Sequence, residues 1–317
     1  MPQLLPAVAD LADFLRARDQ PIDAWRPALH TLAVRHGYPD EPATRFASGQ
    51  GPVFAASGQL VVKLVPWFWA HVVQREAECL RYFAGKTSLP VARIAAEGTL
   101  EDWHYVVLSR LPGEQLDQVW PQLPRPDRMK LAGGFGALLR ELHRIPVGTL
   151  RPGGIAWAQF LEHRVASWTE RRDLDRLPPP LREDGPRFLA AAGAQGATGP
   201  LVLLHGDLAP ENALVERDAA GWRFSGLLDF GNAMVGDPLF DLTAPTVLLA
   251  PGQGEVVNRI LAGYHGADTP GAKPLRARLM ALTLIHPMAD LPECLALIEG
   301  AEACPTWAAV AERFWPG

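Results

Sequence analysis

Apolar and polar residues follow different periods in different parts of the chain. Apolar side chains recur every three or four residues over 4–18 and 23–36, which predicts two amphipathic helices, the second ending at Gly37. Residues 45–65 instead alternate between apolar and polar positions around two clusters of turn residues. That alternation predicts two strands joined by a tight turn.

The same alternation of helix and strand patterns continues to residue 110. One more helix and two more strands are expected next, over 69–84, 91–97 and 104–110. The pattern then breaks at Leu111, Pro112 and Gly113. We therefore predict a β-rich first domain with a helical N-terminal extension over 1–111 and a second domain over 112–317.

The second domain has mainly helical patterns. Helical spacing covers 127–143 and 156–172, and a Pro-rich turn is expected at 178–180. An apolar strand precedes His205, and a β-hairpin with its turn near 218–221 follows. Further helices are expected at roughly 253–265, 273–289 and 292–300.

The composition is that of an ordinary globular protein. Hydrophobic residues make up 48% and charged residues 21%, which excludes a largely disordered chain. The 30 basic and 35 acidic residues give a formal charge of −5, so no general nucleic-acid partner is expected. The N-terminus has no basic start and carries Asp10 and Asp13 in its apolar pattern. We predict a soluble, cytoplasmic protein with no membrane partner.

The segment from His205 to Asp241 holds the residues most informative about chemistry. Asp207 follows an apolar strand, Asn212 comes five residues later, and Asp229 comes seventeen residues after that. The hairpin between them would return the chain to its start, so Asn212 and Asp229 should be neighbours in space. Two such oxygen donors suit Mg²⁺, and Asp207 could then orient a hydroxyl and accept its proton. Taken singly, each residue would more simply cap or form a turn.

Three motifs in this segment carry a resemblance to a known family: HGDLAPEN, LLDFG and GDPLFDL. Together they resemble the aminoglycoside phosphotransferase family, and the match extends from about Phe46 to Asp241. The resemblance implies an α+β, bilobal protein-kinase-like fold with a small antiparallel β-sheet N-lobe and a larger, mainly helical C-lobe. It also implies transfer of the γ-phosphate of ATP, or of GTP, to a hydroxyl of a small molecule, with Mg²⁺ as cofactor.

The motifs also imply roles for individual residues. By resemblance, Asp207 is the catalytic base, and Asn212 and Asp229 bind Mg²⁺. Asp241 would brace the catalytic loop through hydrogen bonds to its backbone. His205 would support the same loop, which agrees with the structural role expected of an isolated histidine.

The first domain supplies the residues that nucleotide binding would need. Lys63 lies between Val and Leu on a half-buried strand, where its charge needs an anionic partner. The resemblance makes that partner the α- and β-phosphates of the nucleotide. It places Glu76 on the next helix as the ion-pair partner, with Glu78 as the competing candidate. The simpler alternative is a lysine whose ammonium group reaches solvent.

Two further segments are assigned to the nucleotide. The turn between the first two strands contains Ser48, Gly49 and Gly51, where glycine would let the backbone approach phosphates closely. Gly-rich turns are also common without any ligand. Ser109 and Leu111 stand at the expected hinge between the lobes, where backbone groups would contact the adenine base.

The acceptor is indicated less directly. Only four residues separate Gly231 from Gly236, and Gly206 stands where protein kinases carry arginine, so a peptide acceptor is disfavoured. The acidic segment 287–317 could attract a small hydroxylated cation such as an aminosugar, although a solvated helix face would have the same composition. Five aromatic residues could line a sugar pocket or simply form core: Trp157, Phe160, Trp168, Trp307 and Trp315.

Two other functions remain open at this level. One is a metabolic kinase that phosphorylates choline, a sugar, homoserine or a ketoamine. The other is a pseudokinase scaffold that binds nucleotide without turnover, which the presence of Lys63, Asp207, Asn212 and Asp229 disfavours. The sequence does not indicate the oligomeric state.

Overall fold

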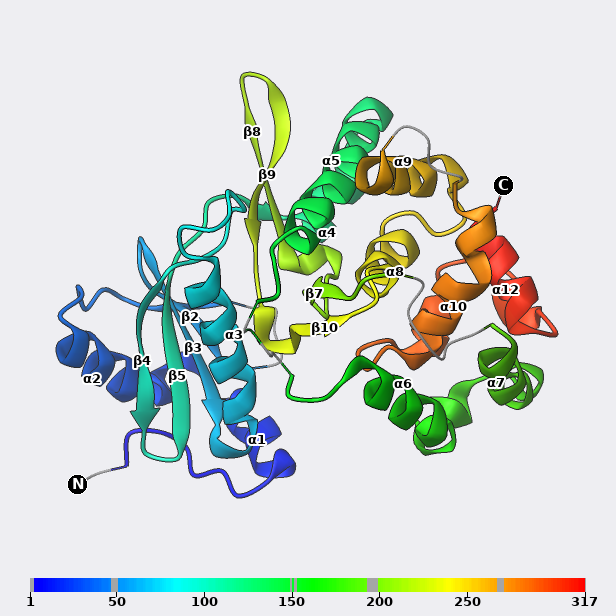
Figure 1. The fold of residues 1–317 in the computed structure, drawn as a ribbon. Helices are drawn as coiled ribbons and strands as arrows, with labels where there is room; N and C mark the ends of the chain where they lie inside the picture. The colour runs from blue at the N-terminus through cyan, green and yellow to red at the C-terminus, as the bar shows by residue number, and fades with distance from the viewer. Residues whose placement is uncertain are drawn as a thin grey trace. The chain divides into compact units, whose positions relative to one another are not determined.

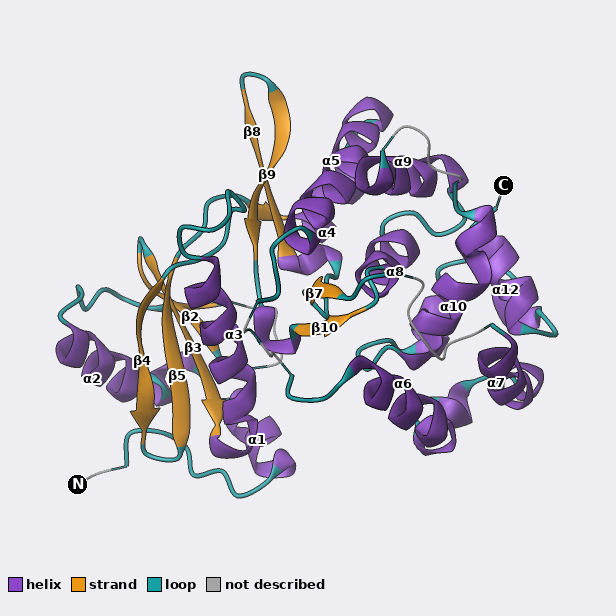
Figure 2. Ribbon diagram, viewed as in Figure 1, coloured by secondary structure: helices purple, strands orange, loops and turns teal. Residues whose placement is uncertain are grey.

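The chain divides into two compact units in the computed structural model, which describes residues 3–46, 51–148, 150, 153–192, 199–266 and 271–316 (Figure 1). The first unit comprises Met1–Pro112 together with Leu228–Asn232, and the second comprises Gly113–Leu227 together with Ala233–Gly317. Figure 2 shows that the first unit is built around a β-sheet and that the second is mainly helical. No helix among the described residues is long and apolar enough to cross a membrane.

The first unit contains a five-stranded antiparallel sheet with the strand order β1-β2-β3-β5-β4. Its strands are β1 (Thr44–Arg45), β2 (Val53–Ser57), β3 (Leu60–Pro66), β4 (Ile94–Leu100) and β5 (Trp103–Ser109). In the central pair, Lys63 on β3 lies opposite Val106 on β5. The predicted strands are therefore present, and the lysine lies in the middle of the sheet.

The two faces of this sheet carry different helices, because successive side chains of a strand point to opposite faces. Val62 and Leu64 of β3 belong to a core that includes residues of α1 (Leu11–Arg18) and α2 (Arg26–His36). Lys63 points to the other face, where α3 (Ala70–Phe83) packs against β3, β4 and β5 (Figure 1). The alternation of the strand thus directs the lysine toward α3.

The N-terminal extension packs on the sheet, but its first part is not helical. The helix predicted from residue 4 begins only at α1, because the carboxylate of Asp10 accepts a hydrogen bond from the Asp13 amide at 2.9 Å and caps the helix there. The Glu101 carboxylate, in the turn between β4 and β5, accepts hydrogen bonds from the amides of Leu4 and Leu5 at 2.8 and 2.9 Å. These bonds tie the extension to the sheet.

The second unit surrounds two small sheets with helices. Its strands are β6 (Glu114–Gln115), β7 (Val202–Leu204), β8 (Ala213–Asp218), β9 (Gly221–Leu227) and β10 (Met234–Gly236). β7 pairs with β10, and β8 forms the predicted hairpin with β9. Its helices are α4 (Leu116–Val119), α5 (Arg125–His143), α6 (Trp157–Ala166), α7 (Pro179–Ala191), α8 (Leu239–Leu248), α9 (Gly254–His265), α10 (Arg276–Ile285), α11 (Leu291–Ala296) and α12 (Trp307–Phe314).

The sequence pattern did not predict four of the described helices of this unit, α4, α7, α8 and α12, and two of them show why. The Pro-rich stretch 178–180 begins α7 instead of forming a turn, because a proline in the first helical turn lacks only an N–H that has no partner there. The pattern also does not predict α8, whose residues are apolar almost throughout and show no clear period.

Helices α5 and α9 approach each other to backbone contact. A Cβ atom built on Gly136 would lie 2.0 Å from the Ile260 carbonyl oxygen, and one built on Gly263 would lie 2.1 Å from the Gly133 carbonyl oxygen. Only glycine leaves room for this approach. Because glycine has no side chain, the two helices can cross at this short distance.

The segment between α10 and α11 is held by buried polar contacts. Arg171 donates to the carbonyl oxygens of Leu284 and Ala289 at 2.9 and 2.8 Å and forms an ion pair with Asp173. Within this segment, the His286 ring is 5% exposed and stacks on Phe240 of α8, with 4.5 Å between ring centroids. The segment is thereby fixed against the start of α8.

The α5–α9 crossing can be tested with Gly136→Ala. The new methyl group would meet backbone atoms of α9, which cannot move alone, so we expect a loss of about 1–3 kcal/mol in the free energy of unfolding, measured in urea. Gly134→Ala is the matched control, since its Cβ would lie 3.3 Å from the edge of the Phe224 ring and alanine favours a helix by up to about 1 kcal/mol. Equal stability of the two variants would contradict this close crossing.

His286 should make stability depend on pH. Burial, opposed by the charge of Asp241 and reinforced by Arg164 and Arg171, lowers the pKa of His286 to about 4, against about 6.5 in the unfolded chain. The unfolded state therefore binds the extra proton between these values, and the free energy of unfolding should fall by on the order of 3 kcal/mol as pH drops from 6.5 to 4. His286→Gln should flatten this slope in urea titrations, whereas the exposed control His163→Gln should keep it. A slope unchanged by His286→Gln would refute the assignment.

Candidate active site

A buried ion-pair cluster lies on the α3 face of the sheet in the first unit. The Lys63 Nζ atom is 3.0 Å from Glu76 Oε2 and 2.7 Å from Asp229 Oδ1. The side chains of Lys63 and Glu76 are only 12% and 3% exposed. The structure places Glu76, and not Glu78, beside the lysine, because Glu76 lies on the buried face of α3 while Glu78 is exposed.

The cluster keeps the lysine charged. Burial alone would lower the pKa of Lys63, but the carboxylates of Asp229 and Glu76 outweigh this effect, and the pKa is raised above its usual value. Burial also raises the pKa of Glu76, against the opposing charge of the lysine. The ammonium group is therefore a permanent cation that points out from the sheet.

Asp229 is anchored to α3 by the two residues that follow it. Phe230 is fully buried, and its ring meets Phe83 of α3 edge to face, with 5.0 Å between centroids. The Gly231 carbonyl oxygen accepts a hydrogen bond from Arg75 at 3.1 Å. Asp229 itself has φ of 61°, a left-handed conformation that costs of order 1–3 kcal/mol and is found mostly at functional sites. The surrounding contacts hold the carboxylate on Lys63 despite that cost.

The second unit holds Asp207 in a loop that is fixed at its start by Asp241. The loop follows β7, and the Asp241 carboxylate, in the first turn of α8, accepts hydrogen bonds from the backbone amides of His205 and Gly206 at 2.7 and 2.9 Å. Gly206 has φ of +82°, which suits glycine. His205 is fully buried. The backbone is therefore fixed just before Asp207.

His143 at the end of α5 supports the same carboxylate. Its Nε2 atom lies 3.0 Å from Asp241 Oδ2, and both side chains are almost completely buried. Burial would raise the pKa of Asp241. The hydrogen bond and charge of His143, the charge of His205 and the hydrogen bond from the Gly206 amide outweigh burial, and the pKa is lowered below its usual value. Asp241 is thus an ionised carboxylate with buried donors around it.

Asn212 closes the other end of the loop. Its Nδ2 atom donates to the Asp207 carbonyl oxygen at 2.8 Å, and this bond does not use the amide oxygen, which is the atom able to bind a cation. The hairpin that follows pairs Ala213 with Leu227. Asn212 belongs to the second unit and Asp229 to the first, so their meeting around one Mg²⁺ ion stays a prediction.

The residues assigned to the rest of the nucleotide site are placed as follows. Ser48 and Gly49 lie outside the described residues. At Gly51, a Cβ atom would lie 3.1 Å from the Leu64 carbonyl oxygen, so this end of the turn lies close against β3. The Ser109 hydroxyl accepts a hydrogen bond from the Arg93 amide at 2.8 Å. Leu111 is half-buried just beyond β5.

Sequence reasoning missed several residues that support the loop. His143 ends a helix with no motif around it, and only the three-dimensional contact with Asp241 reveals its role. Asp237, in GDPLFDL, accepts from the Leu239 amide at 2.9 Å and forms a buried ion pair with Arg278 of α10 at 2.6 Å. A buried aspartate beside a motif was the available signal for this second pair.

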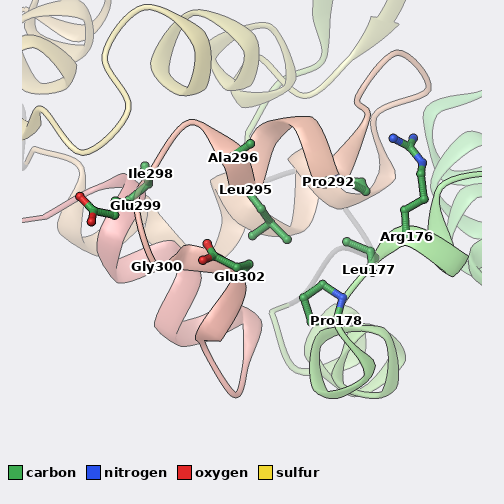
Figure 3. A pocket seen from close by; sticks show the side chains of 10 residues that line it. All are labelled: Arg176, Leu177, Pro178, Pro292, Leu295, Ala296, Ile298, Glu299, Gly300 and Glu302. Atoms are coloured by element: carbon green, nitrogen blue, oxygen red, sulfur yellow. The ribbon is translucent and has the colours of Figure 1, made fainter.

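A pocket of about 790 Å³ lies in the second unit between α11 and the segment that leads into α7 (Figure 3). Leu295 contributes to its apolar lining, and Arg176, Glu299 and Glu302 contribute charged groups. Arg176 is paired with Asp290. No ion pair is found for Glu299 or Glu302 within the described part of the chain.

The aromatic residues considered for a sugar pocket are mostly core. Trp157, Trp168, Trp307 and Trp315 are each 4% exposed or less. Phe160 is half-buried and stacks on Trp157, with 5.3 Å between ring centroids. The structure therefore favours the packing interpretation for the four tryptophans.

Comparison with known protein families and sequences agrees with the motifs. The model of a family described as the phosphotransferase enzyme family (APH) matches residues 42–278. Viomycin phosphotransferase of Streptomyces vinaceus is 30% identical over 211 residues, which cover 63% of this chain and 70% of the relative. An aminoglycoside 3′-phosphotransferase of Streptomyces ribosidificus is 25% identical over 202 residues, covering 58% and 67%.

Solved structures share the fold. The GDP and kanamycin complex of APH(2″)-IIIa aligns with a TM-score of 0.66 at 19% identity, covering 87% of this chain and 92% of that one. The streptomycin–ATP complex of APH(2″)-IIa aligns with a TM-score of 0.59 at 16% identity, covering 82% and 90%. The predicted protein-kinase-like fold is thereby confirmed, and so is the resemblance drawn from the motifs. The chain belongs to the phosphotransferase enzyme family and is a kinase that transfers a phosphoryl group to a hydroxyl of a small molecule.

Proposed function

We propose that this enzyme is an Mg²⁺- and ATP-dependent O-phosphotransferase of cationic, hydroxylated small molecules. In this proposal the first unit binds the nucleotide, and the second unit supplies the base and the acceptor site. The observation that supports it most directly is the Lys63 ammonium group held between Glu76 and Asp229. A cytoplasmic location, where ATP is abundant, is part of the proposal.

Lys63 would bind the α- and β-phosphates. Its charge is permanent because two carboxylates stabilise it, and the hydrogen bond to Glu76 on α3 fixes the direction of its side chain. A fixed cation loses little conformational freedom when phosphate arrives, so the contact helps to align the triphosphate. Gly51 and the backbone at Ser109 and Leu111 would complete the nucleotide site, with Ser48 and Gly49 in the phosphate-binding turn.

The donor atoms available for Mg²⁺ fit a hard cation. Asp229 supplies a carboxylate that is 41% exposed, and Asn212 supplies an amide oxygen not used in the bond to Asp207. Within the described residues no group of three or more His, Cys, Asp or Glu side chains could hold a metal ion by itself. When bound there, Mg²⁺ would neutralise charge on the β- and γ-phosphates.

Asp207 would orient the acceptor hydroxyl and take up its proton. The residue is half-buried, and its loop is fixed on one side by Asp241 and on the other by Asn212. Phosphoryl transfer depends mainly on alignment of the nucleophile with the phosphorus atom. A loop held at both ends provides that alignment.

The acceptor would be a polyhydroxylated cation such as an aminoglycoside or a related basic antibiotic. The named relatives are phosphotransferases of viomycin and of aminoglycosides. Glu299 and Glu302, which line the pocket of Figure 3 and form no ion pair with another described residue, favour a positively charged ligand over a neutral one. A metabolic amine alcohol such as choline is the alternative acceptor.

We expect turnover with a basic aminosugar or peptide antibiotic and its loss in Asp207→Ala. A panel of viomycin, aminoglycosides, choline, homoserine and ketoamines would be assayed by nucleotide consumption, with mass spectrometry to detect one added phosphate. Removing the base should reduce kcat by roughly 10²–10⁴-fold. Asp175→Ala, at a fully exposed aspartate of the same unit, is the control. Wild-type turnover in Asp207→Ala would disprove the base assignment. Turnover with choline alone would show that the acceptor is a metabolic amine alcohol and not an antibiotic.

Asp229→Ala should remove the Mg²⁺-dependent part of nucleotide binding. The wild-type protein should gain about 2.7 kcal/mol of stability from nucleotide at 100 times its Kd when Mg²⁺ is present, and much less in EDTA. In Asp229→Ala the two conditions should give the same thermal shift, because the carboxylate ligand is missing. Asp102→Ala, in an exposed turn of the first unit, should behave as wild type. A full Mg²⁺ effect in Asp229→Ala would exclude the residue as a ligand.

A further inference from the structure

One hydroxyl group lies at the outer end of a hydrogen-bonded chain that leads to the catalytic loop. The Oη atom of Tyr264, on α9, is 2.7 Å from His143 Nδ1, and His143 Nε2 is 3.0 Å from Asp241 Oδ2. Asp241 in turn accepts from the two backbone amides just before Asp207. Three side chains from three helices therefore join the surface of α9 to the backbone of the loop.

We propose that Tyr264 is a positioning residue for phosphoryl transfer, which holds the Asp207 loop in its productive geometry through His143 and Asp241. The assignment rests on the proposed role of Asp207 as the base. Tyr264 touches neither Asp207 nor the nucleotide in this scheme, and its effect is transmitted entirely by His143.

The hydrogen-bond donors along the chain can be assigned from the chemistry of the groups. An ionised carboxylate only accepts, so His143 donates to Asp241 through Nε2–H. His143 Nδ1 then faces the Tyr264 hydroxyl at 2.7 Å, and a hydroxyl can act as donor or acceptor to a ring nitrogen. Burial, with the charges of Asp241 and Asp237, raises the pKa of Tyr264, so the hydroxyl keeps its proton. The tyrosine thereby holds the imidazole in the orientation that serves Asp241.

The helix crossing explains why the tyrosine reaches its partner. His143 lies seven residues beyond Gly136 on α5, two helical turns along the same face. A Cβ atom on Gly136 would meet the Tyr264 amide nitrogen at 2.6 Å, so the backbone of α9 at Tyr264 lies directly on α5. The two rings meet edge to face, with 5.3 Å between centroids. The glycine contact thus sets the distance across which the hydroxyl acts.

Burial makes this hydrogen bond matter for the loop. His143 is 8% exposed and Asp241 is 2% exposed, so water cannot easily replace the tyrosine as the partner of Nδ1. A buried ring nitrogen without its hydrogen-bond partner costs free energy that the folded loop can relieve by moving. The imidazole would then turn or change tautomer, and the Asp241 carboxylate would lose its buried donor.

The test is Tyr264→Phe, which removes the hydroxyl and keeps the ring. We expect kcat to fall roughly three- to tenfold, as loss of one buried hydrogen bond predicts, with KM for ATP unchanged because Lys63 is not involved. We also expect the ¹⁵N resonance of His143 Nδ1 to move, which a purely structural role would not require. The matched control is Tyr38→Phe, since the buried Tyr38 hydroxyl has no partner among the described residues.

A double variant decides whether the effect passes through the histidine. Tyr264→Phe combined with His143→Gln should have the same kcat as His143→Gln alone. Effects that multiply, or a kcat for Tyr264→Phe equal to that of the Tyr38→Phe control with an unmoved His143 signal, would overturn the proposal. Full turnover in Asp207→Ala would instead count against the base assignment, and the His143 resonance would still report on the hydrogen bond itself.

Discussion

A charge removed from water must be compensated by groups close to it, and this requirement determines where the reactive segments of the protein lie. In the first unit the buried ammonium of Lys63 has Glu76 on one side and Asp229 on the other. In the second unit the buried carboxylate of Asp241 has His143 and two loop amides. Since loss of one partner leaves the other charge buried and unpaired, each cluster holds its chain segment firmly in place.

The helices of the second unit act as a frame for one loop. Asp241 comes from α8, His143 from α5 and Tyr264 from α9, while Arg278 of α10 fixes the neighbouring Asp237. Reactive side chains are commonly carried by loops on rigid elements, and their positions are only as well defined as the residues behind them. Here that support comes from helices widely separated along the chain.

The sequence predicted the parts of the fold that repeat and missed those that depend on distant contacts. The alternation around Lys63 and the turn near 218–221 gave the sheet and the hairpin correctly. Helix α8 was missed because it is apolar almost throughout and packs on a helix far along the chain, α10. Two other errors have local causes: a capping carboxylate delays the start of α1, and prolines expected to form a turn begin α7.

The same distinction applies to the candidate site. Asp207 could be named from its spacing to Asn212 and Asp229, and Asp241 from the resemblance that the motif GDPLFDL carries. His143 and Tyr264 could not, since a histidine or tyrosine on a helix carries no signal until its partner on another helix is known. The resemblance favoured Glu76 over Glu78, and the structure agrees, since Glu76 lies on the buried face of α3 and Glu78 is exposed.

The first unit is built from two separate segments of the chain, and this affects which fragments of the protein can fold. Its last five residues, Leu228–Asn232, are supplied by a return of the chain more than a hundred residues after Pro112. A fragment that stops at Pro112 would lack Phe230, whose ring covers Phe83, and would leave the Lys63 cation with one carboxylate instead of two. The first unit is therefore not a contiguous module, and its buried lysine gains its second carboxylate only after the polypeptide has been synthesised through the hairpin.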